Sequence, residues 1–340
     1  MTQLLAPRFS HTMIETVKRC PKKAEFRYVK GYTPRVKGVN LERGTWVHEL
    51  LASYYEHVKE HGWENGKAAI ESRHKELLKD TWEPLFDEEK EEFGLDFPDE
   101  CLAISLRYVD KWEVQDRSQI ARILFVEQMI PVDLPELPAP FQFKCDLIYL
   151  NRLGMAVIVD HKVVGDVPDE EDRMLDSQGP RYVLGLTEFL RSRGVLDKIN
   201  GVVMVYDYIR NRTPRVPTLN KNGSMSRAAI DTEWDVYRQA LLDNDLDPSD
   251  YKEMLDKIAR QGKPFFERWA VPISDYRLEA ESNELGAVAP QLYRQEVYPR
   301  NLDRMRCRWD CEYKDLCIVE MQGGDIEPIL QNRFEVRTRR

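Results

Sequence analysis

The sequence lacks any apolar run that approaches the ~20 residues needed to span a membrane, and its first residues, MTQLLAPRFS, lack the charged and apolar regions of a signal peptide. These absences predict a soluble, intracellular protein. No internal repeat or low-complexity tract is present either, and 42% of the 340 residues are hydrophobic. A chain of this length and composition can fill a sizeable core, so disorder of the whole chain is excluded.

An excess of positive charge is also absent, because 50 Lys and Arg residues face 59 Asp and Glu residues and leave a net charge of −9. The surface as a whole therefore repels anions, and a nucleic-acid partner would need a local basic groove. One candidate lies between Pro21 and Lys37, where six basic residues face a single acid, Glu25, and are interleaved with aromatic residues. A solvated basic surface is the alternative interpretation of this segment.

Cysteine is sparse and unevenly placed, because three of the six cysteines fall within the single segment MRCRWDCEYKDLC. These three are Cys307, Cys311 and Cys317. An intracellular chain favours free thiols or metal ligands over disulfides, and three clustered thiols need a fourth ligand to complete a zinc site or an iron–sulfur cluster. We expect Cys20 to be that ligand, since Cys101 and Cys145 fall in helical and strand patterns. The alternatives are that the clustered cysteines are buried small apolar residues, or that the metal is zinc.

Helical patterns occupy the first third of the sequence. Ser10 can cap a helix over 11–19 that places Cys20 just past its end, where the following proline prevents easy continuation. Apolar residues recur at helical spacing from Gly44, and a charged, helical insert follows over about 65–120.

The pattern changes to strands between Arg122 and Arg210, where four segments are rich in β-branched and aromatic residues. One helical pattern, from about Pro180 to Ser192, separates the last two strands. After Pro217 the pattern is helical again. Strands followed by a helix and a further strand predict an α/β protein with a central mixed sheet flanked by helices.

Acidic residues interrupt two of the predicted strands. In FQFKCDLIYL, a period of two places Asp146 on the face opposite a row of apolar side chains. That row consists of Phe141, Phe143, Cys145, Leu147 and Tyr149. In the next strand, MAVIVDHKVV, the same period places Asp160 and Lys162 on one face and turns His161 away. A short turn joins the two strands, so we expect a hairpin in which the two carboxylates converge.

Converging carboxylates suit a hard cation such as Mg²⁺, and Lys162 can orient or deprotonate the attacking water or stabilise the developing charge of a phosphate. Gln178 and Tyr182 share one face of the following helix if Gln178 lies at its start, because proline is tolerated only in the first turn. This combination predicts metal-assisted hydrolysis of a phosphodiester bond. The alternative is that both acids are strand-end charges paired with neighbouring lysines.

In the order of its motifs, the chain resembles the PD-(D/E)XK nucleases of the RecB-like branch, whose members include Cas4-like and phage exonucleases. The similar segments are CPKKAEFRYV, GTWVH, the strand acid Asp146, the acid-x-lysine motif of Asp160 and Lys162, QGPRY, and the cysteine cluster. The chain departs from the family pattern in three ways. Asp160 replaces the commoner glutamate, no glycine precedes Asp146, and three residues rather than two separate Cys307 from Cys311.

The resemblance implies a restriction-endonuclease-like core with helical insertions and a Mg²⁺- or Mn²⁺-dependent DNA exonuclease. It assigns catalysis to Asp146, Asp160, Lys162, Gln178 and Tyr182, metal binding to His48, Asp146 and Asp160, and a [4Fe–4S] cluster that joins the N- and C-terminal segments to Cys20, Cys307, Cys311 and Cys317. On the sequence alone, His48 lies beside an apolar stripe and is expected in the core packing. Glu127, an acid in the strand segment LFVEQM, is expected not to be a ligand.

The resemblance also implies a cytoplasmic protein, in the host cytoplasm if phage-encoded, that acts on single-stranded DNA or duplex ends beside a recombination or single-strand-annealing protein. The alternative function is a non-catalytic DNA-end-binding or CRISPR-adaptation subunit. No G-x-x-x-x-G-K-[ST] motif is present, so no ATP motor is expected in this sequence. We predict five parts: an N-terminal helix and basic segment, a helical region with His48, the nuclease core, a second helical region, and the cysteine cluster with a basic tail. Their bounds are 1–43, 44–121, 122–216, 217–300 and 301–340.

Overall fold

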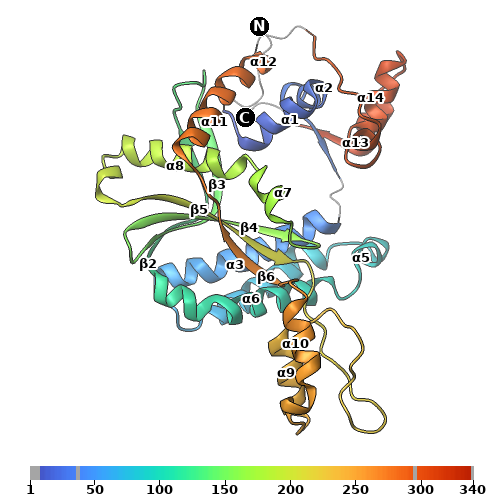
Figure 1. The fold of residues 1–340 in the computed structure, drawn as a ribbon. Helices are drawn as coiled ribbons and strands as arrows, with labels where there is room; N and C mark the ends of the chain where they lie inside the picture. Colours follow the sequence, from blue (N-terminus) through green and yellow to red (C-terminus); the bar gives the residue numbers. More distant parts are fainter. Residues whose placement is uncertain (1–7, 36–38, 294–296, 338–340) are drawn as a thin grey trace.

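A five-stranded mixed sheet forms the centre of the protein in a computed structural model, which describes residues 8–35, 39–293 and 297–337 (Figure 1). In spatial order the strands are β2 (Ile120–Val132), β3 (Phe141–Asn151), β4 (Met155–Val164), β5 (Gly201–Arg210) and β6 (Phe266–Ala270). Only β4 and β5 are parallel, and the helix between them supplies the crossover that a parallel pair needs. The predicted α/β class with a central mixed sheet is confirmed.

Four strands were predicted, and the fifth, β6, lies in the segment that the sequence pattern assigned to helices. It pairs with β5 over only five residues, from Val205–Ala270 to Ile209–Phe266. The division into five parts stays a prediction, but the sheet extends beyond the predicted core.

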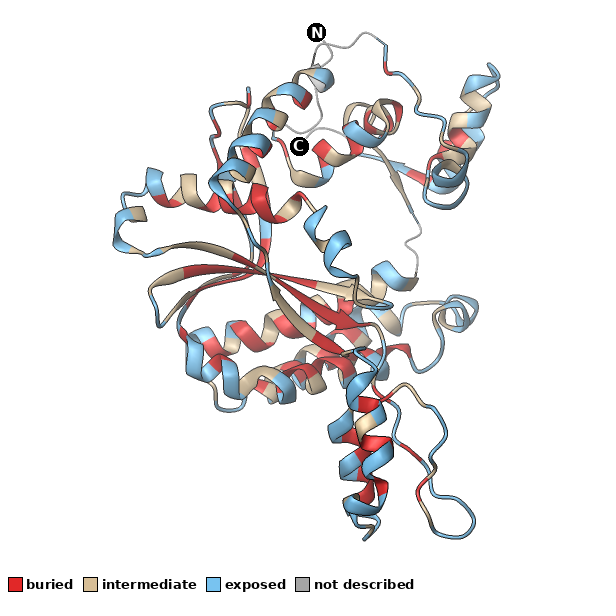
Figure 2. Ribbon diagram, in the orientation of Figure 1, coloured by how far each residue is buried: buried red, intermediate tan, exposed pale blue. Residues whose placement is uncertain are grey.

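Helices cover both faces of the sheet, and their buried sides face it (Figure 2). One face carries α3 (Val39–His61), α4 (Gly66–Leu77) and α6 (Phe97–Gln119), and the other carries α1 (His11–Arg19), α8 (Gln178–Ser192) and α11 (Asp275–Val288). Helix α1 has the predicted bounds and the predicted Ser10 cap. Helix α3 begins at Val39 rather than Gly44, since an interior glycine costs a helix only about 1 kcal/mol.

The predicted single apolar face of β3 is wrong. Phe141, Phe143 and Cys145 pack in the core beside α8, whereas Leu147 and Tyr149 pack in the core beside α3. The period of two is interrupted between Cys145 and Leu147, where β3 gains β4 as its second neighbour. Asp146 stands at this interruption.

A small subdomain joins two segments far apart in the sequence (Figure 1). Strand β1 (Tyr32–Pro34) pairs antiparallel with β7 (Phe334–Val336). Around this ribbon lie α2 (Pro21–Ala24), η1 (Glu25–Val29), α13 (Arg304–Trp309), α14 (Lys314–Met321) and α15 (Glu327–Arg333). The subdomain has its own apolar core, in which Phe26 packs with Tyr313, Leu316, Leu330 and Phe334.

The remaining elements are short or peripheral. A projection between β5 and β6 holds α9 (Trp234–Asp243), η4 (Pro248–Tyr251) and α10 (Lys252–Arg260) around a separate apolar cluster (Figure 1). The others are η2 (Leu78–Trp82), α5 (Asp87–Phe93), α7 (Glu170–Met174), η3 (Leu196–Lys198) and α12 (Pro290–Tyr293). Among the described residues, no helix has both the length and the apolar character to cross a membrane.

Candidate active site

Asp146 and Asp160 meet where two central strands separate. Strands β3 and β4 pair from Leu150–Ala156 to Leu147–Val159, and the same register would next place Asp146 opposite Asp160. Beyond that point the pairing ends, and one Asp146 oxygen accepts a 2.7 Å hydrogen bond from the backbone N–H of His161. The side chain of Asp146 therefore occupies the fork between the strands and links them.

A third acid, Glu127, stands in the same row on β2. The pairs Val126–Leu147 and Gln128–Cys145 flank Glu127 and Asp146, so these two acids lie opposite each other. Glu127 has a φ of +47°, in the left-handed region that few residues other than glycine adopt. It also forms an ion pair with Lys144. Three neighbouring strands thus each contribute one carboxylate to one place in the sheet.

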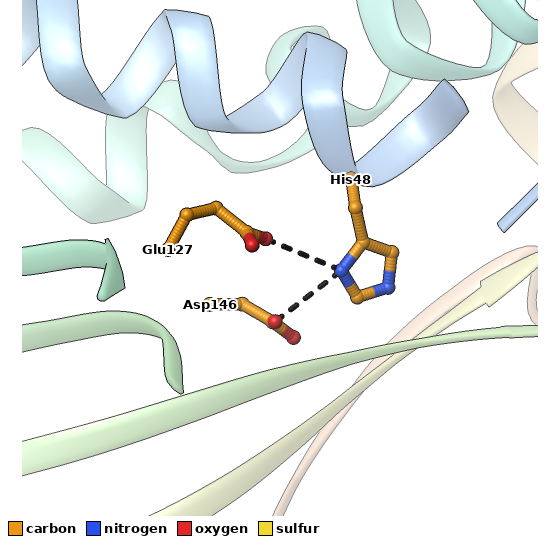
Figure 3. Close-up of side chains that lie close together, drawn as sticks. All are labelled: His48, Glu127 and Asp146. Carbon is orange, nitrogen blue, oxygen red and sulfur yellow. Dashed lines mark ion pairs between the residues drawn. The ribbon is translucent and has the colours of Figure 1, made fainter. Parts of the chain in front are cut away.

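His48 reaches this row from α3 (Figure 3). Its Nδ1 lies 3.3 Å from an Asp146 oxygen and 3.4 Å from a Glu127 oxygen. One ligand-type atom from each of the three residues lies within 4.8 Å of the other two, as expected for groups that share a metal ion. Glu127, which was expected not to be a ligand, therefore lies within reach of an ion shared with His48 and Asp146, and its role as a ligand stays a prediction. An acid in an otherwise apolar strand was the only available signal.

The charges of this group stabilise one another. Burial alone would lower the pKa of His48, but Asp146 and Glu127 raise it to about 10. Burial alone would raise the pKa of Asp146, but His48 lowers it to about 2. Asp146 thus stays ionised beside a positive charge, and its carboxylate and that of Glu127 offer the oxygen ligands that a hard divalent cation prefers.

Asp160 belongs to a second hydrogen-bonded group, on the α8 side of the sheet. Lys162 Nζ lies 2.7 Å from one Asp160 oxygen, and Gln178 Nε2 donates to the other over 2.7 Å. Lys162 also donates to Gln178 Oε1. Burial raises the pKa of Asp160; Lys162 opposes this rise and Asp146 adds to it. The predicted orientation of Asp160 and Lys162 on one face is confirmed.

Gln178 is the first residue of α8, which places Pro180 in the first turn, where proline is tolerated. The backbone N–H of Gly179 donates to the hydroxyl of Tyr206 over 2.8 Å and fixes the start of the helix. Tyr182, one turn further, is buried, and its ring packs on Phe143 with centroids 5.3 Å apart. The predicted helix start at Gln178 is confirmed, and this start brings Gln178 into contact with Asp160.

A buried polar network supports the fork from the α3 side. Arg268 of β6 donates to Asp207 over 2.9 Å and forms an ion pair with Asp116. Tyr108 donates to Asp207 over 2.6 Å, and His161 Nδ1 lies 3.5 Å from the same oxygen. His161 of β4 contacts this network through its side chain and holds Asp146 through its backbone N–H. The network therefore stabilises β4 at the point where Asp146 is bound.

The four cysteines predicted to form a cluster line one cavity of about 220 Å³ in the small subdomain. Cys20 lies between α1 and α2, Cys307 on α13, Cys311 in the following turn and Cys317 on α14. Each is a partly exposed free thiol. The cavity is also lined by six basic residues, Lys22, Lys23, Arg300, Arg304, Arg308 and Lys314.

The other two cysteines lie elsewhere. Cys101 and Cys145 are buried in the apolar cores beside α3 and α8, and burial raises the pKa of each thiol to about 12. Neither lines the cavity of the other four.

The lysines of the predicted basic edge are paired with acids of the small subdomain. Lys22 lies 2.7 Å from Glu25 and 2.8 Å from Glu320, and Lys23 lies 2.6 Å from Glu312. Lys37 lies outside the described residues. The paired lysines hold the subdomain together, a role that neither the nucleic-acid groove nor the solvated basic surface had predicted.

A mixed sheet whose carboxylates meet at a strand fork, with a lysine two residues beyond one of them, is suited to hydrolysis of phosphodiester bonds. The protein thus falls in the class of nucleases. The model of one nuclease family, the PD-(D/E)XK nuclease superfamily, matches residues 8–318, and the chain belongs to this superfamily.

Two other comparisons add little. A crystal structure from Eubacterium rectale described as "Putative exonuclease" is similar with 11% sequence identity, a TM-score of 0.45 and coverage of 94% of each chain. Comparison with curated proteins gives no match.

Proposed function

We propose that this protein is a DNA exonuclease that uses Mg²⁺ or Mn²⁺, carries a structural [4Fe–4S] cluster and processes DNA ends in recombination or repair. Membership of the nuclease superfamily supports the reaction type. The observation that carries the proposal is the row of Glu127, Asp146 and Asp160 at the fork, with His48 on one side and Lys162 on the other.

The residues at the fork fit a hard divalent cation, because they offer carboxylate oxygens and one imidazole nitrogen. His48, Glu127 and Asp146 would hold the cation, and Asp160 completes the acidic row. When bound, the cation supplies Lewis-acid polarisation of the scissile phosphate. His48 would bind the cation as a neutral imidazole, and the cation would supply the positive charge that Asp146 receives from protonated His48 in its absence.

Lys162 supplies positive charge next to the position of the reacting phosphate. Its ammonium group is held by Asp160 and Gln178 at once, so it needs little reorganisation when negative charge develops on the phosphate oxygens. Gln178 in turn fixes the Asp160 carboxylate through its amide N–H. Tyr182 is buried against Phe143 and hydrogen-bonds Gln178, so it would hold in place the amide that a nucleotide meets.

Digestion of 5′- and 3′-labelled single- and double-stranded DNA with Mg²⁺ or Mn²⁺ tests the reaction. We expect stepwise loss of terminal nucleotides that depends on the metal. Tight binding of DNA ends without cleavage under any of these conditions would favour the non-catalytic subunit instead.

The metal site can be probed by single substitutions. His48→Ala and Glu127→Gln should each raise the Mg²⁺ concentration for half-maximal cleavage by about tenfold or more, since each variant removes one group that holds the cation. Excess Mn²⁺ should restore part of the rate. The matched control is His57→Ala, on the same helix, because His57 contacts the carbonyl of Glu64 rather than the acids. Unchanged metal titrations would place His48 and Glu127 outside the metal site.

The cysteine cavity fits an iron–sulfur cluster, because four free thiols from distant segments line it and basic residues surround it. A cluster with four thiolates is anionic, and Arg304 and Arg308 of the lining would offset part of its charge, whereas Lys22, Lys23 and Arg300 are paired with acids. Zinc can use the same four thiolates, but only iron–sulfur absorbs visible light near 400 nm.

We expect anaerobically purified wild-type protein to be brown and to hold about four irons per chain. Cys20→Ser, Cys311→Ser and Cys317→Ser should each lose this colour and destabilise the fold, since each removes one ligand of a group that joins two distant segments. Cys101→Ser and Cys145→Ser should keep full iron, because both thiols lie in apolar cores away from the cavity. Full iron in Cys20→Ser would show that another residue is the fourth ligand, and a colourless wild type with bound zinc would replace the cluster by a zinc site.

A further inference from the structure

His11, the first residue of α1, lies beside the proposed active site. Its ring meets the ring of Tyr182 edge to face, with centroids 6.5 Å apart. The backbone on its N-terminal side is fixed, because Phe9 pairs with Phe141 of β3 and Ser10 caps α1. His11 therefore lies on the same side of the sheet as Tyr182, where the charge of Lys162 also reaches it.

The contacts of the imidazole define its tautomer. Nδ1 lies 3.3 Å from a terminal nitrogen of Arg181. A guanidinium group only donates hydrogen bonds, so Nδ1 must be the acceptor and a neutral ring must carry its proton on Nε2. Burial and the charge of Arg181 lower the pKa of His11 to about 4, with Lys162 acting in the same direction and Asp176 and Glu15 opposing. The ring is thus neutral at pH 7.

Arg181 is itself held independently of His11. It is fully buried and forms ion pairs with Glu15 at 2.8 Å, Glu281 at 3.1 Å and Glu284 at 3.2 Å. These three acids keep its guanidinium in place whatever stands at position 11. The contact with this fixed guanidinium therefore sets the orientation of the imidazole. The Nε2–H of His11 points away from Arg181 and has no hydrogen-bond acceptor among the described residues.

Resting on the proposed function, we propose that His11 is a DNA-binding residue whose Nε2–H donates a hydrogen bond to a phosphate oxygen of the strand held at Gln178 and Tyr182. A phosphodiester oxygen is an acceptor, and a neutral donor can bind it without adding a second cation beside Lys162. Such a contact positions the strand rather than taking part in bond cleavage.

Three substitutions separate the donor from the other properties of the ring. His11→Phe keeps a ring against Tyr182 but has no nitrogen. His11→Asn can place an amide oxygen near the position of Nδ1 and keep the contact with Arg181, but it does not reach as far as Nε2. His11→Gln can place an amide N–H near the position of Nε2.

Binding is measured by fluorescence anisotropy with labelled single-stranded and duplex DNA in an Asp160→Asn background, and KM and kcat are measured with Asp160 intact. We expect His11→Phe and His11→Asn to raise Kd and KM about tenfold, equivalent to about 1.4 kcal/mol and within the range of one hydrogen bond to a charged group. His11→Gln should stay within about twofold of wild type. We expect kcat and the Mg²⁺ titration to be unchanged in all three variants.

Wild-type affinity in His11→Phe would overturn the inference, and so would a His11→Gln variant as weak as His11→Phe, which would indicate a packing role. If His11→Phe melts early, the comparison of Asn with Gln decides. DNA binding without cleavage in the wild type would contradict the proposed exonuclease activity. The Kd values of the His11 variants would still test the proposed hydrogen bond. Absence of DNA binding in the wild type would overturn both proposals.

Discussion

Asp160→Asn should lower the cleavage rate by about 10³-fold or more while leaving the melting temperature close to that of the wild type. The asparagine keeps the size of the side chain and can still accept a hydrogen bond from Gln178, and Lys162 keeps its contact with Gln178 Oε1. The change removes a buried negative charge whose pKa is raised by burial and by Asp146. Folding therefore loses little, whereas the acidic row at the fork loses the member next to Lys162.

The rate is measured with end-labelled DNA under saturating Mg²⁺, and unfolding is followed by circular dichroism. Asp197→Asn, at an exposed aspartate of η3, is the matched control and should cut DNA like the wild type. Near-normal turnover by Asp160→Asn would contradict the proposed mechanism. Loss of activity together with a large loss of stability would show that Asp160 serves the fold.

Arg268→Met should lower the free energy of unfolding by about 3–5 kcal/mol, the largest effect on stability that we expect from a single substitution outside the small subdomain. Asp207 is fully buried and Asp116 nearly so, and Arg268 forms ion pairs with both. The guanidinium also lies over Trp112, 4.5 Å from the ring centroid. Without Arg268, two carboxylates remain buried with no cation to balance them.

Chemical denaturation of the purified variant measures this loss. Arg260→Met, at an arginine that is 81% exposed, should change stability by less than about 0.5 kcal/mol. Adding Asp116→Asn and Asp207→Asn to Arg268→Met should recover part of the loss, because the unpaired charges are then removed as well. A loss below about 1 kcal/mol in the single variant would mean that water or another group compensates the two acids.

The parts of the site that the sequence predicted depend on local patterns. Asp160 and Lys162 are two residues apart on one strand, so a period of two is enough to place them on one face. Gln178 precedes a proline that is tolerated only in the first turn, and Ser10 precedes a helix that it caps. Each of these predictions needs only the geometry of one element. The roles of these residues in catalysis stay predictions.

The parts that the sequence missed depend on how distant elements meet. Glu127 faces Asp146 only in the observed register of β2 on β3, and two irregularities earlier in that pairing shift the count of residues along the strands. β6 has five residues and becomes a strand because β5 offers it a free edge. His48 lies beside the buried face of α3, so the helical pattern alone predicts that it packs in the core. Its contact with Asp146 depends on how α3 crosses the sheet, which the pattern of one helix does not give.

Because β1 pairs with β7, the small subdomain can fold only after the C-terminal segment has been synthesised. A ribosome releases residues 20–34 long before residues 304–336, so Phe26 emerges without Tyr313, Leu316 or Phe334 to cover it. The central sheet can form during this interval, since all its strands lie between residues 120 and 270. The cysteine cavity is assembled last, because three of its four thiols belong to the late segment. A chain whose translation stops before residue 304 would therefore carry the complete acidic row but no four-thiol pocket, and the proposed cluster could be inserted only after synthesis has passed this point.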